Sequence, residues 1–382
     1  MDNIAGRKST LTWVVHLSVV ALVLLWLFPT IGLFVSSFRT TDQITASGWW
    51  KSMFPSEQNL TLRVADPGTA QVQKDGLWVI EGNLFDGAPV GEISVWGTSS
   101  REIAAYSAGE TADLGDGESL TVQSNGDYVM TATAEMTGRG QRVFVTASAP
   151  PDFTTNNYRF LLVDPANIDG MSKAFFGTLT VTIPATIIPI LVAAFAAYAL
   201  AWMDFPGRAL LIAAIVGLLV VPLQLALIPL LKFHNDIGIG KGYLGVWLAH
   251  TGFGLPLAIY LLRNYMVGLP RDIIECAKVD GATDFQIFTK IVLPLSFPAL
   301  ASFAIFQFLW TWNDLLVAKV FLIDPTAGTT VMTDKIVQLM GSRGGNWEIL
   351  ATAAFISISV PLLVFFAMQK YLVRGLLAGS VK

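Results

Sequence analysis

The polar side chains with the most specific spacing in this sequence lie in one short segment between two apolar stretches. The segment runs Glu275-Cys276-Ala277-Lys278-Val279-Asp280-Gly281, and Ile291-Val292-Leu293-Pro294 begins ten residues after its glycine. The segment holds charged groups and the only cysteine of the chain, but neither a histidine nor a second thiol. These residues are suited to charged contacts with a partner protein, and we predict no catalytic group among them.

The local signals around this segment predict two short helices separated by a break. Pro270 suits a first helical position, where a missing N–H costs nothing, and Gly281 permits the backbone to reverse. Thr283 and Gln286 match a capping box that begins a second helix.

Residues 271–279 place three apolar side chains on one predicted face: Ile273, Ile274 and Ala277. The predicted loop covers residues 267–290. We call this loop together with residues 291–294 the lever, because the pattern predicts a rigid bent unit with an apolar face for a partner. On periodicity alone, a loop that merely covers the helices is the alternative.

A second group of polar and aromatic residues lies toward one end of an apolar stretch. Polar groups at membrane depth are costly and often mark a functional site, and aromatic faces beside a carboxylate suit a sugar ring. Interfacial anchoring by tryptophan and hydrogen bonds between helices are the alternative explanation. The candidates for a substrate path are Trp310, Trp312, Asn313 and Asp314 in this stretch, together with Gln224 in the stretch 209–231.

Other motifs point to no further chemistry. Gly240-Lys241-Gly242 lacks the earlier glycine and the following hydroxyl residue of a phosphate-binding loop, so we predict no ATP site and no bound cofactor. The three histidines and one cysteine form no zinc pattern, so we predict no metal. Cys276 is interpreted as a small packed residue. The net charge of −4 excludes a nucleic-acid footprint.

The elements that must position these residues are membrane helices. The chain is 53% hydrophobic and 14% charged, with a mean hydropathy of +0.57, and a span needs about 20 apolar residues. The first stretch is too long for a typical signal peptide, although cleavage is a weighed alternative. Six stretches qualify as spans: 11–35, 174–202, 209–231, 243–262, 291–320 and 348–369.

Six spans put both termini on one side of the membrane. Lysine and arginine are more frequent on that side, which by the positive-inside rule is the cytoplasm. The side with the termini carries Arg7, Lys8, Arg208, Arg263, Arg271, Lys278, Lys290, Lys370, Arg374 and Lys382. The short loops opposite carry Lys232, Lys241, Lys319, Lys335 and Arg343.

Residues 39–165 differ in composition from the rest of the chain. Short β-prone runs alternate with turn signals there, which predicts a small all-β sandwich or partly open barrel outside the membrane. The strongest hairpin signal is Asn125-Gly126, which suits a type I′ turn. The β-prone runs are 60–64, 77–81, 93–96, 120–123, 128–132, 143–147 and 158–163. We therefore predict three parts: 1–38 with the first span, an extracytoplasmic β-rich domain over 39–170, and a five-helix core over 171–382.

The lever resembles the signature loop of binding-protein-dependent ABC importer permeases. The matching residues are Glu275, Ala277, Gly281, Ile291, Leu293 and Pro294, with Cys276 in place of an alanine. The resemblance extends from about 173 to 382. Over this range the chain is similar to the carbohydrate branch of the family, in particular to the second permease of maltose systems. The long external insertion is similar to that of α-glucoside importer permeases.

The resemblance implies an all-α polytopic fold of six transmembrane helices, the type I importer permease fold, with the β-rich domain inserted. It implies an inner-membrane subunit that carries a sugar and leaves ATP to its partners. Those partners would be a second permease subunit, two ATPase subunits, an extracytoplasmic sugar-binding protein and membrane lipid. The lever would dock on an ATPase through Glu275, Cys276, Ala277, Asp280, Gly281, Ile291, Leu293 and Pro294. The tail 375–382 would be a secondary contact.

Two other classes of protein remain as alternatives to an importer permease. A secondary transporter would need ion-coupling carboxylates and inverted repeats, but the spans hold few acids apart from Asp314. A membrane-anchored sensor whose β-rich domain binds a ligand would leave the spacing of the lever unexplained. If the chain is an importer permease, the β-rich domain could either receive the sugar-binding protein or brace the partner permease.

Overall fold

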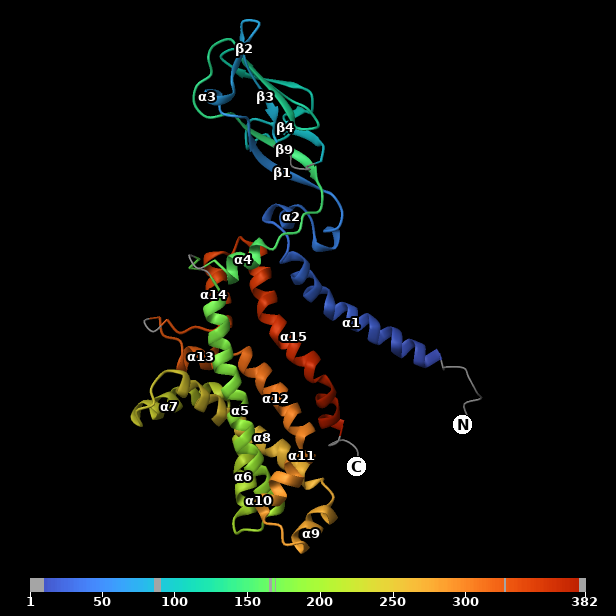
Figure 1. Ribbon diagram of the computed structural model, residues 1–382, viewed down its shortest axis with the longest axis vertical. Helices are drawn as coiled ribbons and strands as arrows, with labels where there is room; N and C mark the ends of the chain where they lie inside the picture. The colour runs from blue at the N-terminus through green and yellow to red at the C-terminus, as the bar shows by residue number, and fades with distance from the viewer. Residues whose placement is uncertain (1–9, 86–90, 165–166, 169, 326–327, 378–382) are drawn as a thin grey trace. The chain divides into compact units, whose positions relative to one another are not determined.

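The computed structural model describes residues 10–85, 91–164, 167–168, 170–325 and 328–377 (Figure 1). These residues form two compact units. The first unit comprises Met1–Arg159 with Gly345–Thr352, and the second comprises Phe160–Gly344 with Ala353–Lys382. The predictions that concern Arg7, Lys8 and the end of the C-terminal tail fall outside the described residues.

The first unit begins with an apolar helix, α1 (Thr10–Ser36). Its stretch Leu11–Ser36 has a hydropathy of 2.4 and is long enough to cross a membrane. Its exposed side chains are apolar on all faces apart from His16 and Ser18, as expected for a helix that lies in lipid. Two short elements follow, α2 (Thr41–Ala46) and η1 (Trp49–Lys51).

A buried hydrogen-bond cluster holds the chain together at the end of α1. The amide of Asn157 donates to the carbonyls of Ser37 and Arg39 at 2.9 and 3.0 Å, and the hydroxyl of Thr352 donates to the carbonyl of Ser37 at 3.1 Å. Asn157 belongs to α4 (Asn156–Leu162). The expectation of a strand over 158–163 is therefore wrong, because this segment is helical and its asparagine pairs with the backbone after α1.

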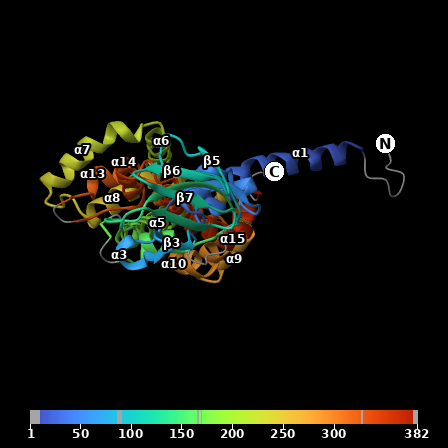
Figure 2. The ribbon, with the colours of Figure 1, turned by 90° about the horizontal axis from the view of Figure 1, so that it is seen from above.

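The β-rich region of the first unit is a sandwich of two antiparallel sheets (Figures 1 and 2). The four-stranded sheet has the order β1-β9-β4-β5 and the five-stranded sheet the order β2-β3-β8-β7-β6. Between the sheets lies an apolar core whose fully buried members include Ile80, Ile93, Trp96 and Leu120. The strands are β1 (Ser56–Arg63), β2 (Val72–Lys74), β3 (Leu77–Asn83), β4 (Ile93–Gly97), β5 (Tyr106–Ser107), β6 (Thr111–Gly115), β7 (Glu118–Val122), β8 (Asp127–Ala132) and β9 (Arg142–Ala149), and α3 (Pro67–Ala70) lies between β1 and β2.

The predicted hairpin at Asn125-Gly126 forms, but its turn is not type I′. Only Gly126 has a positive φ, +88°, whereas a type I′ turn needs two such residues. Both residues have positive φ at Asp75-Gly76 and at Asp116-Gly117, which satisfies that requirement. At Asn125 the loop is longer, because the pairing of β7 with β8 ends at Val122 and Tyr128.

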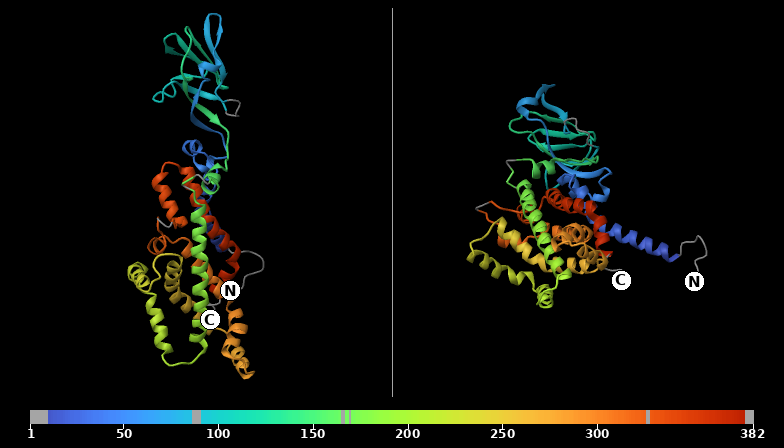
Figure 3. Two further views of the ribbon diagram at one scale, coloured as in Figure 1. Left: turned by 60° about the vertical axis from the view of Figure 1, so that its left-hand side comes forward. Right: turned by 60° about the horizontal axis from the view of Figure 1, so that its bottom comes forward.

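The second unit is helical, and four helices are its longest elements (Figures 1 and 3). They are α5 (Ser172–Trp202), α8 (Tyr243–Val267), α12 (Phe297–Trp312) and α15 (Trp347–Leu377). Two apolar clusters hold the unit together. One joins α5, α8 and α12 to the lever, and the other joins α5 and α8 to α7 (Leu223–Asp236) and α13 (Leu316–Phe321).

Two of the six predicted spans are broken. Among the described residues, four helices qualify as spans alone, and six spans result if each bent pair counts as one. One pair is α6 (Arg208–Leu218) with α7, bent by 109° (Figure 3). The other is Asp284–Leu295 with α12, bent by 70°.

The fifth stretch, expected to be continuous over 291–320, is interrupted twice. Its first break is at Ser296, between Pro294 and Pro298, each of which removes a backbone donor. Its second break follows Trp312, where the carboxylate of Asp314 accepts the N–H groups of Val317 and Ala318 and so starts α13. A further helix, α14 (Met332–Ser342), comes before α15.

Candidate functional site

The first helix of the lever is α9 (Arg271–Val279), and it ends in a hydrogen-bonded reversal. The N–H of Gly281 donates to the carbonyl of Lys278, and the N–H of Ala282 donates to the carbonyl of Ala277, both at 3.0 Å. This is a Schellman motif, and it requires a left-handed residue where Gly281 has φ +81°. Pro270 precedes the helix as its N-cap rather than occupying the predicted first position.

The capping box predicted for the second helix is present. The N–H of Thr283 donates to Oε1 of Gln286 at 2.9 Å, and the N–H of Gln286 donates to Oγ1 of Thr283 at 3.3 Å. The helix continues through α10 (Asp284–Ile287), one π-helical turn η2 (Phe288–Val292) and α11 (Leu293–Leu295). The two caps fix both sides of the break, so the lever has a defined bend.

One face of the lever is buried in the apolar cluster at this end of the second unit. Ile274, Ile287, Phe288 and Val292 are each at most 3% exposed. They pack with residues of α5, α8 and α12. The hydroxyl of Tyr198 on α5 also donates to Oδ1 of Asp284 at 3.3 Å. A displacement of α9 is therefore passed directly to three of the long helices.

The rest of the surface of α9 is exposed, and Glu275 also lines the pocket described below. The side chains of Glu275, Cys276 and Asp280 have no hydrogen-bond or ion-pair partner within the described residues. Cys276 was interpreted as a packed residue, and that is wrong, because Ile274 and Ala277 occupy the inward positions of the helix. Ile273 is likewise 42% exposed and does not share the buried face. Val279 and Phe285 add exposed apolar surface, at 87% and 66%.

The remaining predicted residues of the lever signature lie on its second arm. Ile291 and Leu293 are partly buried against the apolar cluster, as is Ala277 on the first arm. Pro294 is exposed and lies two residues before the bend at Ser296. The signature thus divides into residues that attach the lever to the long helices and residues that face outward.

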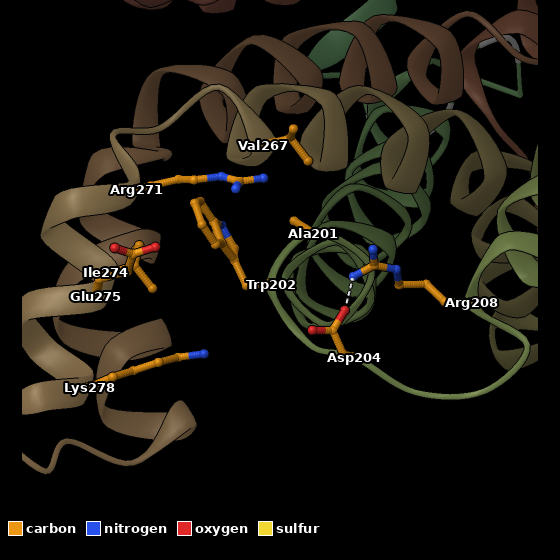
Figure 4. A pocket seen from close by; sticks show the side chains of 9 residues that line it. All are labelled: Ala201, Trp202, Asp204, Arg208, Val267, Arg271, Ile274, Glu275 and Lys278. Atoms are coloured by element: carbon orange, nitrogen blue, oxygen red, sulfur yellow. Dashed lines mark hydrogen bonds and ion pairs between the residues drawn. The ribbon is translucent and has the colours of Figure 1, made fainter.

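A polar pocket of about 220 Å³ lies between α9 and the turn that joins α5 to α6 (Figure 4). Arg271 and Lys278 extend from α9 toward Trp202 at the end of α5. Asp204 and Arg208, paired at 3.0 Å, lie on the other side. The indole N–H of Trp202 is buried and has no partner within the described residues. Sequence reasoning gave Trp202 and Asp204 no role, because only folding brings this turn beside the lever.

Three of the predicted substrate-path residues are used inside the chain. Trp312 is fully buried, and its Nε1 donates to the carbonyl of Ser357 at 2.9 Å. The amide of Asn313 donates to the carbonyl of Leu309 at 2.8 Å. Asp314 starts α13, and its Oδ2 lies 3.7 Å from Nε2 of the buried His250. The polar groups of Trp312 and Asp314 thus have a structural function that needs no ligand, whereas the side chain of Asn313 is exposed.

The other two candidates, Trp310 and Gln224, face outward. Trp310 is 40% exposed and lines an apolar cavity of about 430 Å³, which the break between α6 and α7 and a stretch of α8 also line. Gln224 lies at the start of α7, beside that break, and its side chain is exposed. Within the described residues there is no cluster of three or more His, Cys, Asp or Glu that could hold a metal.

Comparison with protein families gives one match over residues 174–377, to "Binding-protein-dependent transport system inner membrane component". The alpha-glucoside transport system permease protein AglG of Rhizobium meliloti (strain 1021) is 61% identical over 385 residues, covering 99% of each chain. The osmoprotective compounds uptake permease protein GgtD of Synechocystis is 58% identical over 219 residues, covering 57% of this chain and 73% of that protein.

Among solved structures, a bacterial ABC transporter involved in the import of the acidic polysaccharide alginate aligns with a TM-score of 0.47 and 23% identity. That alignment covers 59% of this chain and 81% of the other. The match to the Rhizobium meliloti protein spans nearly the whole of both chains, so it includes the β-rich region.

Proposed function

The chain belongs to the family of binding-protein-dependent transport system inner membrane components, and on this premise we propose that it imports α-glucosides as one permease subunit of an ATP-driven transporter. The substrate class is supported by the 61% identity to a relative named for alpha-glucoside transport. The proposed role is transport without catalysis, and ATP is bound by partner subunits.

The observation that carries the proposal is the division of the lever into an anchored and an exposed face. Ile274 and Phe288 are buried among the long helices, whereas Glu275, Cys276 and Asp280 are exposed and unpaired within the described residues. An exposed, rigid helix that is fixed to several spans is what an ATPase needs in order to move them. The polar pocket beside α9 extends this surface to Arg208 and Trp202.

The proposed topology places the lever and both termini in the cytoplasm, and the β-rich region outside. Cations gather at the lever end of the second unit, where Arg208, Arg271, Lys278 and Lys290 are found. An excess of lysine and arginine in short loops marks the cytoplasmic side. The carboxyl half of α15 lies at the same end, since the ring of Tyr371 packs 5.3 Å from that of Phe297.

The proposed assembly contains a second permease subunit, two ATPase subunits and an extracytoplasmic sugar-binding protein. Closure of the ATPases would move α9, and the buried face of the lever would carry that movement into α5, α8 and α12. The central cavity would then change from inward to outward exposure. Only contacts that differ between the two states can drive such a change.

Asn313 is exposed and stays a candidate for the sugar path. Ahead of Trp312 and Asp314, we propose Trp310 and Gln224. Both side chains are accessible, and Trp310 offers an aromatic face to an apolar cavity. A panel of radiolabelled α-glucosides in uptake assays would identify the sugar. Uptake of an amino acid but of no glucoside would contradict the proposed substrate class.

Co-purification from mild detergent tests the docking surface. We expect the ATPase subunit to be recovered with the native chain and lost with Glu275→Lys, whereas Lys232→Glu, on α7 and outside the apolar cluster of the lever, should retain it. If the ATPase remains bound and uptake persists in Glu275→Lys and in Gly281→Asp, the lever is not the docking site.

The single cysteine gives a second test without any substitution. Cys276 is exposed on α9, so a water-soluble maleimide should alkylate it readily in the isolated chain. Assembly with the ATPase should slow alkylation severalfold, and chain alkylated beforehand should bind less ATPase. Equal alkylation rates in the isolated and assembled chain would place Cys276 outside the interface.

A further inference from the structure

Residues 48–54, which we call the aromatic hook, fold back along α1. The ring of Trp49 lies 4.6 Å from that of Phe28, and the ring of Trp50 lies 6.4 Å from it. Gly32 makes this approach possible, because a Cβ at that position would lie 2.7 Å from Nε1 of Trp49. The hook therefore packs against α1 itself, inside the first unit.

The contact with Phe28 sets the depth of the hook along α1. Phe28 is eight residues before the end of α1 at Ser36, which corresponds to about 12 Å of helix. The apolar stretch of α1 has 26 residues, or about 39 Å, whereas the hydrocarbon core of a bilayer is about 30 Å thick. The stretch therefore exceeds the hydrocarbon by about 9 Å, which is less than the distance from Phe28 to Ser36. The hook therefore reaches the level at which α1 leaves the hydrocarbon.

The outer side of the hook is apolar and exposed. Trp50, Met53 and Phe54 are 61%, 71% and 67% exposed. A hollow of about 460 Å³ lies between the hook and the end of α1, and Phe34, Phe38 and Phe153 help to line it. The only charge within the hook is the exposed Lys51. Exposed aromatic surface of this size is unfavourable in water.

We propose that the aromatic hook inserts into the phospholipid interface at the Ser36 end of α1 and anchors the base of the β-rich region to the membrane. Tryptophan is enriched at this level of membrane proteins because its ring is apolar and its N–H is polar. Lysine can extend its amine to the headgroups while its methylenes remain in the apolar layer. The surface is also continuous with the exposed apolar surface of α1, which crosses the same bilayer.

Lipid is a better occupant of this surface than water or a folded partner. The hook offers a tryptophan, a methionine and a phenylalanine beside one lysine, and no acidic residue lies between Ser47 and Ser56. A protein interface of this kind would need complementary polar groups at its rim, and Lys51 alone supplies little. The proposal depends only on α1 crossing the membrane, so it is independent of the sugar and of the lever.

Spin labels on single cysteines in the full-length chain test the proposal. With Cys276→Ser as the background, Met53→Cys and Phe54→Cys are labelled in nanodiscs of phosphatidylethanolamine and phosphatidylglycerol. Collision rates are then measured with oxygen, which partitions into lipid, and with a nickel chelate, which stays in water. Ser124→Cys, on the β7–β8 hairpin, is the control in water, and Leu22→Cys, on α1, is the control in lipid.

We expect the labels at 53 and 54 to collide severalfold more with oxygen than with the nickel chelate, relative to the label at 124. Their apparent depth should lie between those of the labels at 124 and 22. Nickel collisions equal to those at 124 would place the hook in water and overturn the proposal. Low collision rates with both reagents would mean that protein covers the hook, and would also overturn it.

Discussion

Two sets of polar residues in the second unit are candidate functional sites in the sequence, and their side chains are used differently in the structure. On α9, the side chains of Glu275, Cys276 and Asp280 face outward and have no partner within the described residues. At the end of α12, the indole of Trp312 donates to the backbone of its own chain and the carboxylate of Asp314 accepts from it.

The difference teaches how a polar residue in a membrane protein should be assessed. A polar group whose hydrogen bonds are complete within the chain stabilises the fold, and a ligand would have to compete with those bonds. A polar group on a rigid, exposed helix has no such use inside the chain. The exposed residues of α9 are therefore the better candidates for a docking surface, whereas Trp312 and Asp314 at the end of α12 explain how a broken span is held.

The largest effect is expected from Gly281→Val, which attacks the bend of the lever. A β-branched residue at φ +81° costs roughly 1–2 kcal/mol, and the Schellman motif would open. We expect sugar uptake to fall more than tenfold, as measured with labelled substrate in cells. Gly341→Val is the matched control, because that glycine also has open space around it but no positive φ. If both variants lost sugar uptake equally, the bend at Gly281 would have no special role in transport.

The next effect distinguishes the two faces of α9. Ile274→Ala removes a side chain that is 2% exposed, and such a change in a packed core costs about 2–5 kcal/mol. Ile273→Ala alters an exposed neighbour and should change stability by at most about 0.5 kcal/mol, while it weakens recovery of the ATPase. Thermal unfolding in detergent and co-purification measure the two effects. If Ile273→Ala destabilised the chain more than Ile274→Ala, the buried and exposed faces of α9 would be wrongly assigned.

A smaller effect is expected from Asp314→Ala, which tests the internal half of the comparison. The variant leaves the N–H groups of Val317 and Ala318 without their acceptor, a loss of about 1–3 kcal/mol. Asp314→Asn keeps one acceptor oxygen and should recover part of it. We expect the KM for sugar to stay the same in both variants. A KM raised severalfold at unchanged stability would make Asp314 a substrate contact.

The smallest effect concerns a polar group with complete hydrogen bonds in the β-rich region. The amides of Asn83 and Asn125 donate to the carboxylate of Asp127 and lower its pKa. Because the pKa in the folded state is below that in the unfolded state, the stabilisation is present above the unfolded value, about 3.9. It is lost as the pH falls through the folded value.

Hydrogen exchange of the β7–β8 hairpin measures this loss. The native hairpin should lose protection as the pH falls below about 4, and Asp127→Asn should lose less over the same range. Comparison of the two chains at each pH removes the intrinsic pH dependence of exchange. An identical decline in both would mean that these hydrogen bonds contribute nothing to the pH dependence.

The sequence was most informative where local rules decide the structure. The bounds of α9, the reversal at Gly281 and the capping box at Thr283 follow from residues within a few positions of one another. The membership of the transport family, predicted from the lever signature, is confirmed by the comparisons. The mostly helical fold with a β-rich insertion was also predictable from composition and periodicity.

The sequence was least informative where distant segments meet. The exposure of Cys276 depends on which side of α9 faces α5 and α8, and the helix pattern alone left this open. The break after Trp312 depends on Asp314 accepting backbone groups, which competes with continuation of the helix. The strand expected over 158–163 became α4, because Asn157 pairs with the backbone beyond α1.

The π-helical turn η2 sets the angular phase between the lever and the span that follows it. A π turn holds one residue more than an α turn over the same length, and each α-helical residue corresponds to about 100° of rotation. Removing one residue from Phe288–Val292 would convert this turn to an α-helical one and leave the segments on its two sides in phase. Inserting one residue would instead rotate α9 by about 100° relative to the span that follows. An insertion here would therefore turn the exposed face of α9 in another direction, although every residue of that face would remain in the sequence.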